Sequence, residues 1–190
     1  MFPAPLDDVQ AAVRWLRRKP LGLPVEPGRI GIWGQSAGGH LAATAGLSGS
    51  ADVGVQAVAT ITGLTDLTQQ GGEMWIDRPS PVTALVGGDT SRLRSASPVA
   101  HVHAGATPYL IIHGTSDETV LYEQAELLHR ALLAAGADSR LLRIAGGHHN
   151  LLDDPDAPYD GQIWYGVAMK SRGSSNVNWA SDREPVVRRA

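Results

Sequence analysis

The sequence predicts an α/β fold, with a parallel sheet covered by helices on both faces. Three observations point to this class: short apolar runs recur along the chain, segments with helical spacing separate most of them, and glycine or proline marks the boundaries. Strands that alternate with helices are typical of a parallel sheet, because each connection must return to the end where the strands start. A chain of 190 residues with 43% hydrophobic content can bury one core.

The first elements are a helix, a strand and a second helix. Residues 6–19 repeat apolar side chains at helical spacing, with acidic residues in the first turn and basic residues in the last, as the helix dipole favours. Prolines and glycines between residues 20 and 28 end this helix. Residues 29–33, RIGIW, predict a short buried strand, and residues 39–47 predict a helix made almost entirely of small residues.

The alternation continues in the second half of the chain. Strands are predicted over residues 55–62, 108–114 and 139–147, and a polar, glycine-rich loop runs from residue 63 to about residue 97. Residues 121–135 predict a helix, because four apolar side chains share one face and a glycine follows as a stop.

The character of the sequence changes near its C-terminal end. Serine and asparagine residues interrupt any apolar periodicity after about residue 160. We therefore expect residues 1–160 to form an α/β core and residues 161–190 to form an irregular tail, in which a short helix over residues 162–170 is an alternative.

Composition and charge exclude several functional classes. A net charge of −3 provides no basic field for phosphate groups, so nucleic acid is not an expected partner. The absence of cysteine excludes disulfide bonds and thiolate zinc sites. Residues 1–5 carry neither the basic nor the apolar segment of a signal peptide, and no run reaches the roughly 18 apolar residues of a membrane span. We therefore expect a cytoplasmic protein without a membrane partner.

Ser36 lies in the segment GQSAG, between a predicted strand and a predicted helix. The pattern alone is a weak signal, but in this place it favours a sharp turn that exposes the serine Oγ, with Gly34 and Gly38 supplying clearance. The N–H of Ala37, at the start of the helix, is then one expected oxyanion donor. Two alternatives stay open: an ordinary N-cap serine, and a phosphate-binding loop, which the missing lysine disfavours.

A serine nucleophile needs a base, and the base needs a carboxylate that orients it. Asp117 comes four residues after the apolar run YLII, so its carboxylate is expected at the carboxyl end of the sheet. His148 follows the next strand, after two glycines that let the loop bend back. Three alternatives remain: Asp117 caps the following helix, His149 replaces His148 as the base, or Asp66 replaces Asp117 as the acid.

The other histidines have structural interpretations. His113 is expected to form a hydrogen bond within its loop, and His101 and His103 are expected in a strand or a loop. A metal site built from them lacks a carboxylate at suitable spacing, so we expect neither a metal nor another cofactor. Trp75, in the loop that would line a substrate pocket, is interpreted as a packed aromatic rather than a substrate contact.

Five segments together resemble the α/β-hydrolase fold of esterases and lipases: PAPLDDVQAAVRWL, RIGIWGQSAGGHLAA, ASPVAHV, TPYLIIHGTSDETV and LLRIAGGHHN. The nearest resemblance, over about residues 3–150, is to carboxylesterases related to hormone-sensitive lipase and to bifunctional feruloyl and acetyl xylan esterases. It implies Ser36 as nucleophile, Asp117 as orienting acid and His148 as base, in the chain order that this fold uses. The implied activity is cofactor-free hydrolysis of a small carboxylic ester through an acyl-enzyme.

Two parts of the family pattern are not found in the sequence. Only 35 residues precede Ser36, so neither the glycine-rich oxyanion loop nor the early strands that flank the segment RIGIWG are recognised. We therefore expect an N-terminally truncated α/β-hydrolase, with low activity and with self-association through an exposed sheet edge. The alternatives are an inactive remnant that acts only through protein contacts and a related serine peptidase.

Overall fold

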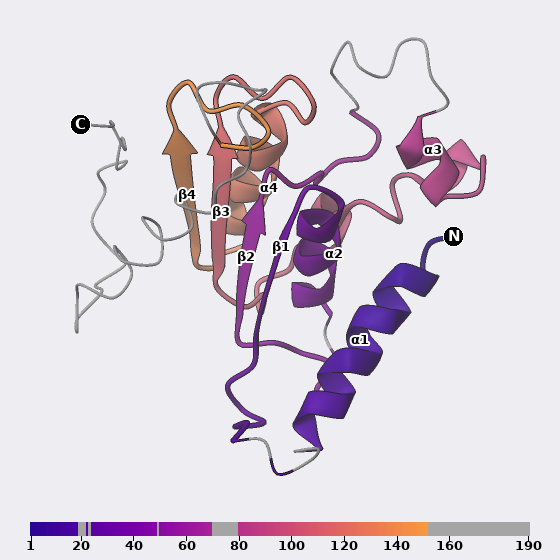
Figure 1. Ribbon diagram of the computed structural model, residues 1–190, viewed down its shortest axis with the longest axis vertical. Helices are drawn as coiled ribbons and strands as arrows, with labels where there is room; N and C mark the ends of the chain where they lie inside the picture. Colours follow the sequence, from indigo (N-terminus) through magenta and orange to yellow (C-terminus); the bar gives the residue numbers. More distant parts are fainter. Residues whose placement is uncertain (19–21, 23, 49, 70–79, 152–190) are drawn as a thin grey trace.

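The computed structural model describes residues 1–18, 22, 24–48, 50–69 and 80–151. Four parallel strands form one sheet in the order β1-β2-β3-β4 (Figure 1). They are β1 (Gly31–Gln35), β2 (Ala57–Ile61), β3 (Tyr109–Gly114) and β4 (Ser139–Ile144). All four overlap predicted strands, so the α/β class and the parallel sheet are confirmed. Trp75 and the predicted tail lie outside the described residues.

Three of the four α-helices in the described residues overlap helices that the sequence predicts. The helices are α1 (Ala4–Arg17), α2 (Ala37–Gly46), α3 (Pro81–Leu85) and α4 (Glu123–Ala134). The segment predicted as a loop over residues 63–97 contains α3 and the short 3-10 helix η3 (Thr90–Arg92), so that prediction is wrong in part. A helix of five residues is too short to display a period, and a proline in its first turn is the signal that the sequence offers.

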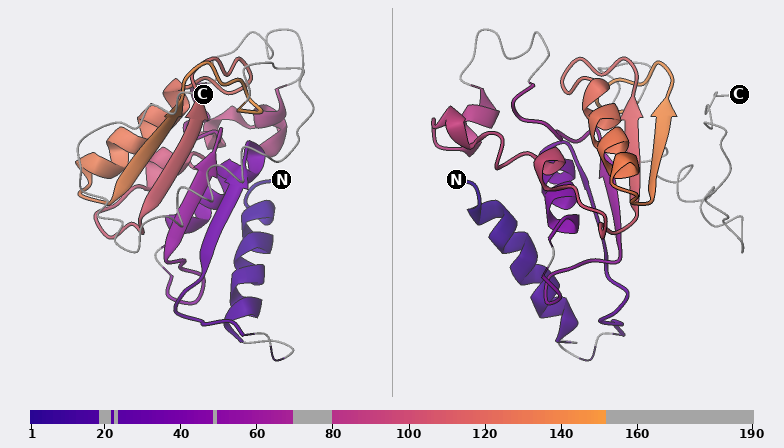
Figure 2. Two further views of the ribbon diagram at one scale, coloured as in Figure 1. Left: turned by 60° about the vertical axis from the view of Figure 1, so that its left-hand side comes forward. Right: turned by 180° about the vertical axis from the view of Figure 1, so that it is seen from behind.

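One face of the sheet carries both α2 and α4. A single apolar cluster joins Ala43 of α2, Leu128 of α4 and Ile111 of β3, and Figure 2 shows both helices on the same side of the sheet. The opposite face forms a separate cluster to which no described helix contributes. The prediction of helices on both faces is therefore not met within the described residues. Each connection steps to the next strand in the same direction, so right-handed crossovers place the helices on one side.

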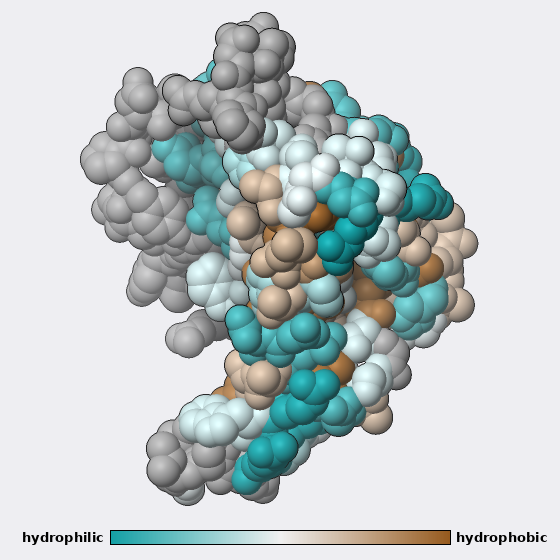
Figure 3. Space-filling view, turned by 90° about the vertical axis from the view of Figure 1, so that its right-hand side faces the viewer, coloured by the Kyte–Doolittle hydropathy of each residue, from teal (hydrophilic) through white to brown (hydrophobic). Residues whose placement is uncertain are grey.

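The helix α1 packs against α2 on the outer side of the helical layer. Val13 is its fully buried residue, and most of its other side chains are partly or wholly exposed. Figure 3 looks onto this side of the molecule, where hydrophilic side chains are interspersed with apolar ones. Among the described residues, none of the helices has the length and apolar character needed to cross a membrane.

The strand β1 forms one edge of the described sheet. Its backbone groups that face away from β2 pair with no other described strand, and Trp33 on this strand is 67% exposed. An edge strand that carries an exposed apolar side chain favours pairing with another chain. Self-association through this edge stays a prediction.

The parallel arrangement brings the carboxyl ends of all four strands to the same end of the sheet. Ser36 directly follows β1, Asp117 follows β3, and the two neighbouring histidines His148 and His149 follow β4. Ligands of open α/β sheets bind at this end of the strands. The residues that the sequence singled out therefore meet at one edge of the molecule.

Candidate active site

Ser36 occupies a strained turn between β1 and α2. Its φ of 55° and ψ of −121° lie in a region that residues with side chains rarely adopt. A Cβ on Gly34 would overlap the Gly38 carbonyl, and a Cβ on Gly39 would lie 2.9 Å from the Thr60 hydroxyl. Gly38 itself has open space beside it, so the crowded glycine after the serine is Gly39, and the assignment of clearance to Gly38 is wrong.

The first turn of α2 lies next to this serine. The Ser36 side chain makes no capping hydrogen bond to the helix, so Ser36 is not an ordinary N-cap serine. Ala37 is the first residue of α2, where backbone N–H groups have no partner within the helix and the helix dipole is positive. The position suits a donor to an oxyanion, and this role of Ala37 stays a prediction.

The Ser36 hydroxyl instead contacts the ring of His149. His149 Nε2 lies 3.0 Å from Ser36 Oγ, and His149 Nδ1 lies 2.9 Å from Asp117 Oδ2. A carboxylate only accepts hydrogen bonds, so Nδ1 carries the ring proton and donates it, and Nε2 is left as the acceptor for the serine hydroxyl. Serine, imidazole and carboxylate therefore form one continuous hydrogen-bonded chain.

The choice of His148 as the base is corrected by this geometry. His149, the alternative, makes both contacts. The loop after β4 is fixed by its backbone: the Ser116 N–H donates to Gly147 O at 3.0 Å, and the Gln35 side chain donates to His149 O at 3.2 Å. These contacts decide which of two consecutive side chains turns toward Ser36. Gln35 is a site residue that sequence reasoning missed, because nothing in the local pattern indicates its long-range partner.

Asp117 is buried, with 4% of its surface exposed, and both its oxygens are occupied. Oδ1 accepts the backbone N–H groups of Thr119 and Val120, each at 2.9 Å. Burial pushes the pKa of Asp117 upward, but hydrogen bonds from His113, His149 and Val120 outweigh burial and hold this pKa well below its ordinary value. The carboxylate is therefore ionised in the folded protein at neutral pH.

This depressed pKa predicts a pH-dependent contribution to stability. Because the folded pKa lies below the unfolded value of about 3.9, the ionised carboxylate stabilises the fold above that pH, and the stabilisation is lost as the pH falls further. We expect the stability difference between the parent chain and Asp117→Asn to shrink as the pH falls from about 5 to below about 4. Urea unfolding at several pH values measures this difference. The variant Glu118→Gln, at the exposed neighbouring carboxylate, is the matched control. An Asp117→Asn difference that is constant with pH would contradict the assignment.

The remaining candidates have structural roles. Asp66 accepts the N–H and the hydroxyl of Thr68, as a turn residue does, so it is not the acid. His101 contacts Ser95 O and is the last residue of the 3-10 helix η4 (Pro98–His101), so its interpretation as a strand or loop residue is wrong. His103 accepts the Gly105 N–H in a loop, as expected.

His113 lies on β3 rather than in a loop, but it forms the local hydrogen bond that was expected, to Val120 O, and it also approaches Asp117. Within the described ranges, no group of three histidine, cysteine, aspartate or glutamate side chains has a metal-binding arrangement.

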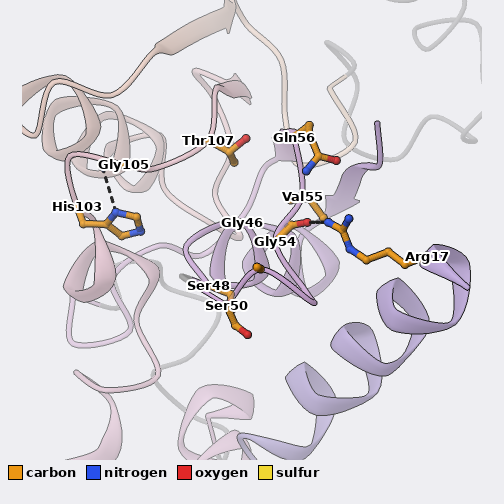
Figure 4. A pocket seen from close by; sticks show the side chains of 11 residues that line it. Arg17, Gly46, Ser48, Ser50, Gly54, Val55, Gln56, His103, Gly105 and Thr107 are labelled. Atoms are coloured by element: carbon orange, nitrogen blue, oxygen red, sulfur yellow. Dashed lines mark hydrogen bonds between the residues drawn. The ribbon is translucent and has the colours of Figure 1, made fainter. Parts of the chain in front are cut away.

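A cavity of about 450 Å³ lies at the opposite, amino end of the strands (Figure 4). Its lining includes Arg17, Ser48, Gln56, His103 and Thr107, and none of the residues in the hydrogen-bonded chain. The Arg17 guanidinium already donates to the carbonyl groups of Pro27 and Gly54, so it is held by the protein itself. The cavity is therefore separate from the candidate active site.

Comparison with known proteins gives consistent matches. The family model described as BD-FAE matches residues 1–132. Esterase LipQ of Mycobacterium tuberculosis is 32% identical over 168 aligned residues, and the match covers 78% of this chain and 39% of LipQ. The chain spans about two fifths of the length of LipQ, and of Esterase LipC of the same organism, which it also matches.

Solved structures share the fold over most of this chain. A truncated form of a carbohydrate esterase from gut microbiota superposes with a TM-score of 0.70 at 25% identity, covering 90% of this chain and 70% of that one. Esterase 2 of Thermogutta terrifontis, phosphonylated by sarin, superposes with a TM-score of 0.68 at 26% identity, covering 87% of this chain and 64% of that one.

Proposed function

Because this chain belongs to the BD-FAE family of α/β-hydrolase esterases, we propose that it hydrolyses carboxylic esters through an acyl-enzyme formed on Ser36. The observation that carries the proposal is the hydrogen-bonded chain from Ser36 through His149 to Asp117. A serine hydroxyl is a weak nucleophile at neutral pH, and an imidazole backed by a carboxylate is the arrangement that removes its proton during attack.

In the first half of the reaction, Ser36 Oγ attacks the ester carbonyl carbon while His149 Nε2 takes the hydroxyl proton. Asp117 stabilises the imidazolium through the Nδ1–H and keeps the ring oriented. The Ala37 N–H donates to the carbonyl oxygen as it becomes negative. His149 then gives its proton to the departing alcohol, and the acyl group stays on Ser36.

The second half repeats these steps with water in place of the serine. His149 Nε2 takes a proton from water as the water oxygen attacks the acyl carbon. The bond to Ser36 Oγ breaks, His149 returns the proton to that oxygen, and the carboxylic acid leaves. The same three side chains therefore serve both halves, and no other group is needed for proton transfer.

The relatives support a covalent step. Esterase 2 of Thermogutta terrifontis has been observed phosphonylated by sarin, a reagent class that reacts with activated nucleophiles. LipQ carries the name of an esterase. We propose the corresponding reactivity for Ser36, which occupies the strained turn and meets the base at 3.0 Å.

The proposal is tested with a fluorophosphonate probe. We expect it to attach to Ser36, as mapped by peptide mass spectrometry, and hydrolysis of p-nitrophenyl acetate to fall in proportion to the labelled fraction. An alanine p-nitroanilide assay in parallel separates an esterase from a peptidase. Labelling at another residue, or turnover that survives complete labelling of Ser36, would contradict the proposal. A folded chain that neither labels nor turns over ester would favour a role in protein contacts alone.

A further inference from the structure

A second imidazole lies against the acid of the proposed triad. His113 Nε2 is 3.2 Å from Asp117 Oδ2, the same oxygen that accepts the His149 Nδ1–H at 2.9 Å. We propose that His113 is a positioning residue, which holds the Asp117 carboxylate in the orientation that His149 requires. This inference rests on the proposed function of Ser36 for its catalytic meaning, but the contact itself is a property of the resting chain.

The surroundings of His113 define its protonation. Nε2 lies 2.8 Å from Val120 O, and a carbonyl oxygen only accepts, so Nε2 carries a proton. The residue is fully buried, and its Nδ1 has no hydrogen-bond partner among the described residues. A cationic ring would bury a second N–H donor without an acceptor, at a large cost in free energy. His113 is therefore a neutral donor through Nε2, shared between Val120 O and Asp117 Oδ2.

Hydrogen bonds join Asp117, Val120 and His113 in a closed ring of contacts. Val120 donates its N–H to Asp117 Oδ1 at 2.9 Å, and its carbonyl accepts the proton of His113. His113 lies on β3, which pairs with β2 on one side and β4 on the other, so the ring is anchored in the middle of the sheet. The ring of Tyr122 packs edge-on against it, with centroids 5.9 Å apart. The loop that carries Asp117 is thereby tied to a rigid element, as a precise catalytic geometry requires.

His40 provides a matched control within the same chain. It is also buried, with 3% exposed, and its Nε2 lies 2.7 Å from the carbonyl oxygen of Ala96. Its hydrogen bond to a carbonyl resembles that of His113, but its ring contacts no carboxylate that the structure describes. Loss of His40 therefore reports the cost of removing a buried imidazole without disturbing Asp117.

The test compares His113→Phe, His113→Gln and His40→Phe. Phenylalanine keeps the ring volume and removes the donor, whereas the glutamine amide restores an N–H near the position of Nε2. For His113→Phe we expect Ser36 to react with the fluorophosphonate probe about 10-fold to 100-fold more slowly. We also expect the low-field NMR signal of the His149 Nδ1 proton to move upfield. His113→Gln is expected to recover most of the labelling rate and most of the parent position of the His149 signal. His40→Phe is expected to leave the His149 signal in place.

Three results would overturn the inference. The first is a His149 signal and a labelling rate in His113→Phe that match the parent chain. The second is an equal change in His40→Phe. The third, measured on the parent chain by imidazole ¹⁵N shifts at pH 7, is a His113 ring with its proton on Nδ1, and this measurement decides the matter even where the phenylalanine variant does not fold. If the probe does not label Ser36 in the parent chain, the proposed function is contradicted. The position of the His149 signal still tests whether His113 orients Asp117.

Discussion

Replacement of Ser36 by alanine is expected to lower ester turnover by on the order of 10⁶-fold, to the level that binding and polarisation alone provide. Ser36 Oγ is the atom that bonds to the acyl group, and it is the hydroxyl that His149 Nε2 meets at 3.0 Å. Without this hydroxyl, the base has no nucleophile to activate. Initial rates of p-nitrophenyl acetate hydrolysis, with the alanine variant purified and folded as the parent is, measure the loss.

The variant Ser36→Gly separates lost chemistry from lost stability. Position 36 has a φ of 55°, where a residue with a side chain stores about 1–3 kcal/mol of strain. Alanine keeps this strain and glycine relieves it, so both variants are expected to be inactive while the glycine variant resists urea better. Turnover in either variant would identify another nucleophile. A glycine variant less stable than the alanine variant would show that the turn is not strained.

The parts of the site that the sequence predicts are those set by local chemistry. The serine is found from its immediate neighbours, since a sharp turn between a strand and a helix selects small residues on both sides. Asp117 is found from its distance to an apolar run, because the end of a buried strand is visible as the end of that run. This prediction does not require the strand order, since the carboxyl ends of parallel strands meet at one end of the sheet whatever their order.

The parts that the sequence does not predict depend on contacts between distant segments. His149 rather than His148 meets Ser36 because Gln35 and Ser116 hold the backbone of the histidine loop. Gln35 lies at the end of β1 and Ser116 lies in the loop after β3, far from the histidines in the sequence. A shift of one residue changes the direction of every side chain. The approach of His113 to Asp117 joins residues only four positions apart, but it depends on the loop folding back onto the strand that precedes it, which apolar periodicity does not reveal. Helices on one face follow from strand order, which periodicity does not reveal.

His148 and His149 are neighbours in the sequence, so each serves as a control for the other in testing which one is the base. They share a residue type, a loop and a partly buried environment, and they differ in which ring enters the hydrogen-bonded chain. Any general effect of losing an imidazole from this loop would therefore appear in both alanine variants. An effect confined to one of them reports the chemistry of that ring alone.

We expect His149→Ala to lower ester turnover by on the order of 10⁶-fold, because removal of the base alone costs about as much as removal of the whole triad. His148→Ala is expected to stay within about 10-fold of the parent, since it takes no part in the contacts to Ser36 and Asp117. Ester turnover and fluorophosphonate labelling rates measure both variants. Asp117→Asn is then expected to fall between them, with a loss of about 10⁴-fold, because the amide leaves the His149 ring in the wrong tautomer for accepting the serine proton. A larger loss in His148→Ala than in His149→Ala would mean that the loop rearranges before catalysis, and it would return the role of base to His148.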